Sequence, residues 1–228
     1  SRLPRPTIYR VCQILEELGW LERVDKRFYL GREIAMLGLS AQLRHPVQQL
    51  LSEDLNALCK EIEQTVYFLI RSEYDSVCVA RFESDSQIRT LVLDVGSRQP
   101  LGMGAGSMAI LSALPSDEMN ETIKHNLQRY QERKTFDEEV FRQSLSDARK
   151  LRFASHDGLF TRGVSGIGVP VTDRGGHPFG AISIAYISNT LDRQHRQRCI
   201  ERMQKAATVV SNRVQMLPQV LQETFPAR

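Results

Sequence analysis

The sequence has no apolar run that approaches the roughly 20 consecutive apolar residues needed to cross a bilayer. Its beginning also lacks the charged start and apolar stretch of a secretory signal peptide. Hydrophobic residues make up 41% of the 228 residues, which is ordinary for a globular protein. These features favour a cytoplasmic protein with one large domain, or with one medium domain and a small appendage.

Cysteine is scarce, and its spacings are not those of metal ligands. The four cysteines are Cys12, Cys59, Cys78 and Cys199. We expect each thiol to be a small buried hydrophobic group in a reducing cytoplasm, and we expect no metal site.

The sequence also lacks a nucleophile elbow, a metal-spaced cluster and a paired-carboxylate motif. His156 stands beside Asp157, and Ser165 and Ser183 follow in a predicted hairpin. A serine nucleophile needs a base, and the base needs an orienting acid, so these residues leave a hydrolase open. Polar groups that line a ligand pocket explain them equally well, and we expect no enzymatic activity.

Positive charge is concentrated at the front of the chain. Residues 1–45 contain eight Lys and Arg against five Asp and Glu, whereas residues 46–228 contain 22 of each. A cationic head on a neutral body favours a DNA-binding segment joined to a domain with another task.

The front segment has the pattern of an amphipathic helix over residues 6–18. Its apolar positions recur at spacings of three and four, a proline stands in its first turn, and a glycine follows its last. These apolar positions are Ile8, Val11, Cys12, Leu15 and Leu18. The other face suits a phosphate backbone, and two short strands over residues 20–24 and 27–30 follow like the wing of a winged helix. An ordinary helix and hairpin with a solvated basic face is the alternative.

Residues 3–10, 15–23 and 28–31 resemble the recognition helix and wing of IclR-type bacterial transcriptional regulators. The matching segments read LPRPTIYR, LEELGWLER and FYLG. In that family two further helices come first, so we expect residues 1–30 to pack poorly or to depend on a neighbouring chain. The DNA contacts that this resemblance implies are Arg2, Arg5, Thr7, Tyr9, Arg10, Lys26 and Arg27.

The middle of the chain changes from a helical to an extended period. We predict helices over residues 31–44 and 47–63, then strands over residues 66–70, 76–83 and 89–95. The breaks between the strands are too short for helical crossovers, so we expect an antiparallel meander.

Three alternating glycines, Gly102, Gly104 and Gly106, precede a helix predicted from Ser107 to just before Pro115. A glycine-rich loop that opens a helix exposes amide groups at the positive end of the helix dipole, which suits a carboxylate. No acid stands about 20 residues beyond the loop, so a dinucleotide site is disfavoured and we expect no cofactor. Glycines that allow tight packing against a sheet are the structural alternative.

The rest of the chain predicts a covering layer, a hairpin and a last helix. The layer comprises helices over residues 116–131 and 137–152, with Ser116 and either Thr135 or Asp137 as caps. The hairpin joins a strand ending near Thr172 to a strand over residues 179–187, and the last helix covers residues 192–217.

The resemblance now extends over the chain and implies an α+β fold class. It implies a partial winged helix-turn-helix over residues 1–30 and a linker helix over residues 31–44, which lies near the dimer interface in the family. Residues 45–228 would form an effector-binding domain similar to a GAF or profilin-like sandwich, with a curved antiparallel sheet flanked by helices.

The resemblance also implies an effector site. Family members hold a small organic acid against the loop before the helix, here Gly104, Ala105, Gly106 and Ser107. Where others have an acid, a cysteine and two serines, this chain has His156, Gly166, Ser183 and Ala185. The glycine and alanine remove volume and hydrogen bonds, while the histidine replaces an acceptor with a possible cation. We therefore expect a wider, less polar pocket for an aromatic or longer aliphatic carboxylate.

The function predicted in this way is ligand-responsive transcriptional regulation. The expected partners are double-stranded operator DNA, a small organic acid effector and further copies of the chain, as a homodimer or a dimer of dimers. The alternatives are a small-molecule-binding protein without a DNA role, or a hydrolase that uses His156 and a serine.

Overall fold

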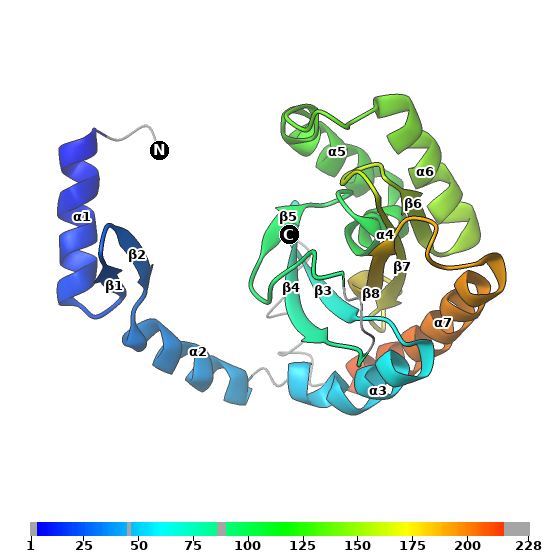
Figure 1. Ribbon diagram of the computed structural model, residues 1–228, viewed down its shortest axis with the longest axis horizontal. Helices are drawn as coiled ribbons and strands as arrows, with labels where there is room; N and C mark the ends of the chain where they lie inside the picture. The colour runs from blue at the N-terminus through cyan, green and yellow to red at the C-terminus, as the bar shows by residue number, and fades with distance from the viewer. Residues whose placement is uncertain (1–3, 45–46, 86–89, 217–228) are drawn as a thin grey trace. The chain divides into compact units, whose positions relative to one another are not determined.

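The computed structural model describes residues 4–44, 47–85 and 90–216 and divides the chain into two compact units, residues 1–47 and 48–228. The first unit holds α1 (Arg5–Glu17), β1 (Leu21–Val24), β2 (Arg27–Leu30) and α2 (Arg32–Arg44) (Figure 1). Within the described ranges, no helix is both long and apolar enough to cross a membrane.

The first unit contains the predicted helix and hairpin but almost no core. Gly19 adopts a φ of +70°, and its amide donates to Glu16 O, so the glycine ends α1 as expected. Strands β1 and β2 pair in antiparallel register from Leu21↔Leu30 to Val24↔Arg27. Helix α1 has no buried residue, and Val11, Ile14 and the C-cap residue Leu18 are about half exposed. Its apolar stripe is therefore at most partly covered by the described residues of this unit, with Ile8, Cys12 and Leu15 half-buried.

The second unit is a mixed α+β fold around one antiparallel sheet of six strands in the order β5-β4-β3-β8-β7-β6. Its strands are β3 (Val66–Ser72), β4 (Asp75–Phe82), β5 (Arg98–Pro100), β6 (Ala154–Asp157), β7 (Val164–Thr172) and β8 (Pro178–Ile187). Its helices are α3 (Val47–Ile62), α4 (Ala105–Ala113), α5 (Ser116–Gln131), α6 (Glu138–Leu151) and α7 (Arg193–Met216). The antiparallel pairing predicted for the first two strands is confirmed by β3 and β4.

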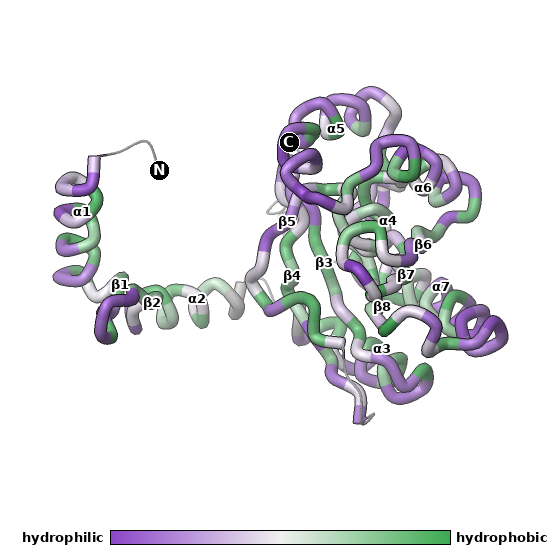
Figure 2. Tube along the Cα trace, turned by 45° about the horizontal axis from the view of Figure 1, so that its top comes forward, coloured by the Kyte–Doolittle hydropathy of each residue, from purple (hydrophilic) through white to green (hydrophobic). Residues whose placement is uncertain are grey.

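The helices cover the sheet in two layers. Helices α4, α5 and α6 lie on one side and α3 and α7 on the other (Figures 1 and 2). Strands β3 and β8 lie at the centre and are buried on both faces, whereas β4 alternates between buried and partly exposed residues. This difference follows from position, because central strands have helices above and below them.

The strand predicted over residues 89–95 is wrong for the described residues 90–95, which form no strand. Leu91, Leu93 and Val95 alternate as in a strand, but side chains bind the backbone between them. The Tyr67 hydroxyl donates to Thr90 O at 2.7 Å and accepts from Val92 N at 3.2 Å. The edge strand of this side is instead β5, three residues farther along. We call residues 90–95 the strap.

Three smaller predictions also change. Helix α4 begins at Ala105, two residues before Ser107, so Gly106 lies inside its first turn. Ser116 is not a cap because Pro115 occupies the N-cap position of α5, whereas the Asp137 side chain does cap α6 by accepting from Val140 N. The stretch before β7 forms a separate edge strand, β6.

Candidate functional site

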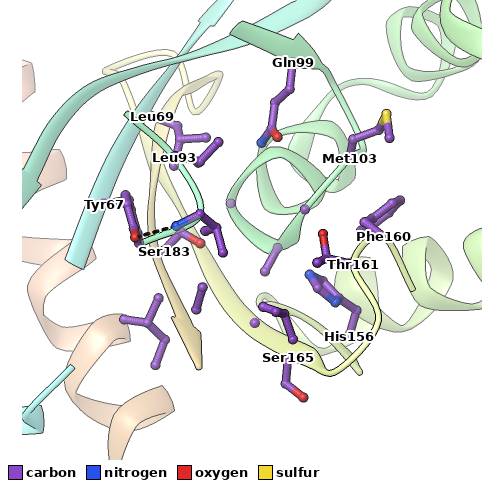
Figure 3. A pocket seen from close by; sticks show the side chains of 18 of the residues that line it. Tyr67, Leu69, Leu93, Gln99, Met103, His156, Phe160, Thr161, Ser165 and Ser183 are labelled. Carbon is purple, nitrogen blue, oxygen red and sulfur yellow. Dashed lines mark hydrogen bonds between the residues drawn. The ribbon is translucent and has the colours of Figure 1, made fainter. Parts of the chain in front are cut away.

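A cavity of about 270 Å³ lies between the start of α4 and the sheet, lined by residues from β3, the strap, β5, α4, β6, β7 and β8. This volume is close to the lower end of the usual range for small-molecule sites, roughly 300–1,000 Å³. Figure 3 shows side chains converging on it from distant parts of the sequence, among them Tyr67, His156 and Ser183.

The start of α4 faces this cavity with its amide groups uncapped. Gly104, the N-cap residue, has a φ of +87°, and no side chain caps the helix. The first intrahelical bond runs from Met108 N to Gly104 O at 2.8 Å. Gly104, Ala105 and Gly106 line the cavity, so the positive end of the helix dipole is directed at it. This arrangement suits an anionic group.

Glycines also let α4 approach the sheet closely, so the packing explanation holds as well. A Cβ at Gly106 would lie 2.8 Å from both Leu69 Cδ1 and Ser183 Cβ. A Cβ at Gly168 would lie only 2.2 Å from Ala105 O. Tight packing therefore places the amides of the first turn against the cavity.

Ser107 does not line the cavity. Its side chain is fully buried, accepts from Gly102 N at 3.0 Å and from Ser76 Oγ at 3.1 Å, and donates to Pro100 O at 3.0 Å. Its hydroxyl group thus holds the glycine loop in place and is not free for a ligand.

His156 lies in β6 opposite Gly166 of β7, and both residues line the cavity. The imidazole meets the Phe160 ring edge to face at 5.2 Å. Burial lowers the pKa of His156 to about 4, and the nearby Asp157 carboxylate raises it only in part. With a pKa of about 4 the ring is neutral at pH 7, so the structure does not favour the cation that the sequence left possible at this position.

The side chains considered for a hydrolase do not form a catalytic arrangement in the described structure. Ser165 Oγ donates to Asp157 Oδ1 at 2.6 Å, and Ser183 Oγ donates to Ile167 O at 3.2 Å. Neither hydroxyl is bonded to the His156 imidazole, which would have to act as the base. The geometry gives the hydrolase alternative no support.

Arg98 and Arg133 line the cavity, and no Asp or Glu is among the lining residues described. The Arg98 guanidinium pairs with Asp75 at 3.3 Å, whereas Arg133 is exposed and pairs with no described carboxylate. Ala185 and Ser183 lie in the cavity wall. The sequence interpretation missed Tyr67, Gln99, Arg133 and Phe160, because no local motif marks them.

The predicted DNA-contacting residues of the first unit are all exposed where the structure describes them. They are Arg5, Thr7, Tyr9 and Arg10 on α1 and Lys26 and Arg27 at the hairpin turn. Arg2 lies outside the described residues.

We expect Tyr67→Phe to lower the free energy of unfolding by about 1–3 kcal/mol, because it leaves two strap groups without their partner. Amides of residues 90–95 should then exchange faster with deuterium than in the wild type. Tyr74→Phe is the matched control, since its hydroxyl reaches Glu121 at the surface. Unchanged strap protection in Tyr67→Phe would contradict the role of this hydroxyl.

Comparison with known proteins adds to this geometry. Residues 40–212 match the family model described as bacterial transcriptional regulator IclR C-terminal. The chain is 29% identical over 123 residues to the HTH-type transcriptional regulator KipR of Bacillus subtilis, covering 54% of this chain and 49% of KipR. It is 26% identical over 193 residues to the transcriptional repressor AllR of Klebsiella pneumoniae, covering 80% of this chain and 68% of AllR. The match to KipR thus spans about half of that protein.

The fold also recurs among solved structures. An IclR homologue from Microbacterium hydrocarbonoxydans, solved in complex with 4-hydroxybenzoate, superposes with a TM-score of 0.73 at 16% identity. The match covers 94% of this chain and 88% of that one, and at this identity it shows the fold alone. Because the family model matches residues 40–212, which is most of its length, the chain belongs to the IclR family of bacterial transcriptional regulators.

Proposed function

We propose that the chain is an effector-responsive DNA-binding regulator whose second unit binds a small organic acid. One observation carries the proposal: the uncapped start of α4 opens into a cavity without a lining carboxylate. An anion gains from the helix dipole there and meets no like charge in the wall.

The residues that line the cavity indicate the chemical character of the part of the acid beyond its carboxylate. Leu69, Leu93, Met103 and Phe160 supply apolar surface, and these side chains suit an aromatic ring or a longer aliphatic chain. The related protein solved with 4-hydroxybenzoate supports the aromatic choice. In this proposal the amides of Ala105 and Gly106 hold the carboxylate and His156 adds a neutral hydrogen bond, with Ser183 and the small residues Gly166 and Ala185 beside it.

The DNA partner is proposed from the first unit and from family membership. The cationic side chains of α1 and of the hairpin turn are exposed and fit a phosphate backbone. We propose residues 1–30 as the DNA-binding segment, residues 31–44 as the linker and residues 45–228 as the effector domain. A homodimer or a pair of dimers in the cytoplasm would match two-fold operators.

The experiment is a thermal-shift series followed by a mobility-shift assay. Benzoate, 4-hydroxybenzoate, hexanoate and glyoxylate are compared at equal concentration, and we expect the larger acids to raise the melting temperature more than glyoxylate by mass action. The intact protein is then titrated onto DNA upstream of its own gene with and without the acid that stabilises it most.

A stabilising acid that changes operator affinity supports the proposal. Stabilisation without any change in DNA affinity refutes the regulatory switch and leaves a small-molecule-binding protein. Failure of the intact protein to retain its own upstream DNA at low salt refutes the DNA role.

A further inference from the structure

We infer that Gln99 is a specificity-determining residue of the cavity, and that the ligand it selects is a 2-hydroxycarboxylate. This role deepens the proposed function and rests on it for the ligand. The position of the side chain can be tested without any ligand, so the two proposals can fail separately.

The Gln99 side chain reaches the start of α4 from the neighbouring strand β5. Its Nε2 lies 3.3 Å and its Oε1 3.8 Å from the place of a Cβ at Gly104, the N-cap residue of α4. Both residues line the cavity, and Figure 3 shows the Gln99 side chain extending toward the interior. A side chain at position 104 would crowd this amide, so the glycine leaves it room beside the uncapped amides of Ala105 and Gly106.

A buried hydrogen-bond network fixes the backbone of Gln99 relative to the helix. Gln99 lies opposite Ser76 in the register of β4 and β5. Ser76 Oγ donates to Ser107 Oγ at 3.1 Å, and that oxygen donates to Pro100 O at 3.0 Å. Both serines are fully buried. Because one network joins β4, the residue after Gln99 and the first turns of α4, the amide is presented to the cavity from a rigid support.

The Gln99 amide is not used by the protein itself. It is half-buried and makes no side-chain hydrogen bond within the part of the chain that the structure describes. Its neighbour Arg98 is engaged elsewhere, with Asp75 at 3.3 Å and Ser72 at 3.1 Å. The amide therefore has both its N–H donors and its carbonyl acceptor available to a ligand.

The two ends of this amide favour one class of ligand. The proposed carboxylate position lies at the first turn of α4, beside the amide. There Nε2 can donate to a carboxylate oxygen, while Oε1 accepts from a hydroxyl group on the carbon next to the carboxylate. A site that bonds a hydroxyl group disfavours the analogue without it, because a polar group of the site then stays unpaired. The geometry thus favours a 2-hydroxy acid over the simple acid.

The first arm of the test compares mandelate with phenylacetate, which differ only in that hydroxyl group, by calorimetric titration of the intact protein. We expect the better-bound enantiomer of mandelate to bind about tenfold more tightly than phenylacetate. In Gln99→Met the ratio should fall to about one, because methionine has no N–H donor and only a weak acceptor. A purely space-filling role of Gln99 would leave the ratio unchanged, since methionine fills similar space.

The second arm tests the position of the side chain without a ligand. Gln99→Glu keeps the shape and places a carboxylate at the positive end of α4, where negative charge is stabilising. We expect the melting temperature at neutral pH to rise by about 1–4 °C. Gln128→Glu adds the same charge at an exposed position of α5 and should give no such rise. The rise should persist beside Arg133→Ala, which excludes a new pair with that arginine as its cause.

Equal affinity of the wild type for mandelate and phenylacetate overturns the inference, and so does a mandelate preference that survives in Gln99→Met. A folded Gln99→Glu that melts no higher than the wild type, or whose rise vanishes with Arg133→Ala, also overturns it, because the side chain then does not reach the start of α4. If Gln99→Glu does not fold, the ratio in Gln99→Met decides. Binding of phenylacetate and benzoate without a mandelate preference leaves the proposed function standing, whereas binding of none of the three acids counts against that function.

Discussion

Gly168→Ala is expected to lower the free energy of unfolding of the second unit by about 1–3 kcal/mol and to weaken benzoate binding by roughly tenfold or more. The new Cβ would lie 2.2 Å from Ala105 O and 2.7 Å from Gly106 N. Both are backbone atoms of the first turn of α4, so no side-chain rotation can relieve the contact. The helix must move off β7 by about 1 Å, because protein interiors are close-packed. Urea unfolding and calorimetric titration with benzoate measure the two effects.

Gly166→Ala is the matched control for stability, two residues away on the same face of β7. Its Cβ would lie 3.0 Å from Ala105 Cβ and 3.1 Å from His156 Nε2, which is the end of a side chain that can turn. We therefore expect a smaller loss of stability than for Gly168→Ala. Equal stability of Gly168→Ala and the wild type would mean that α4 does not depend on this close approach.

The helices with regularly spaced apolar residues could be predicted from the sequence, because that spacing marks the face that each helix buries. The helices that became α3, α5, α6 and α7 were each placed to within about a residue or two. The strap shows where the rule fails. Its apolar residues alternate as in a strand, but its backbone forms hydrogen bonds with the Tyr67 hydroxyl. Tyr67 lies more than 20 residues earlier in the sequence, so a local pattern cannot reveal this partner.

The cavity could be predicted only in part, because its assembly is non-local. Pairing of β3 with β8 sets Tyr67 opposite Ser183, although the two residues lie far apart in the sequence. The glycine pattern marked the start of α4, and family resemblance marked His156. Neither signal could reveal that the imidazole is buried in the cavity wall, which lowers the pKa of His156. The protonation state of His156 depends on all the residues that surround it, and these residues come from several strands.

The exposed arginines of α1 allow the proposed DNA contact of the first unit to be tested, because they contribute little to the fold. Arg5 and Arg10 are exposed and pair with no carboxylate in the described part of the chain. Removing them should leave the fold unchanged, since surface substitutions of this kind usually change stability by less than about 0.5 kcal/mol. A loss of DNA affinity in a variant without these two arginines would then indicate that they contact DNA.

Arg5→Ala/Arg10→Ala in the intact protein is expected to weaken binding to its upstream DNA by about 30-fold at physiological salt, because two phosphate contacts are lost. The slope of log K against log salt should become shallower by about 2, as measured by mobility shift or fluorescence anisotropy over a salt series. Arg193→Ala/Lys205→Ala on α7 is the control, since it removes the same two charges from exposed positions of the second unit. If both double variants lose affinity equally, net charge and not α1 explains the binding. If only the α1 variant loses affinity and slope, its cationic face contacts the phosphate backbone.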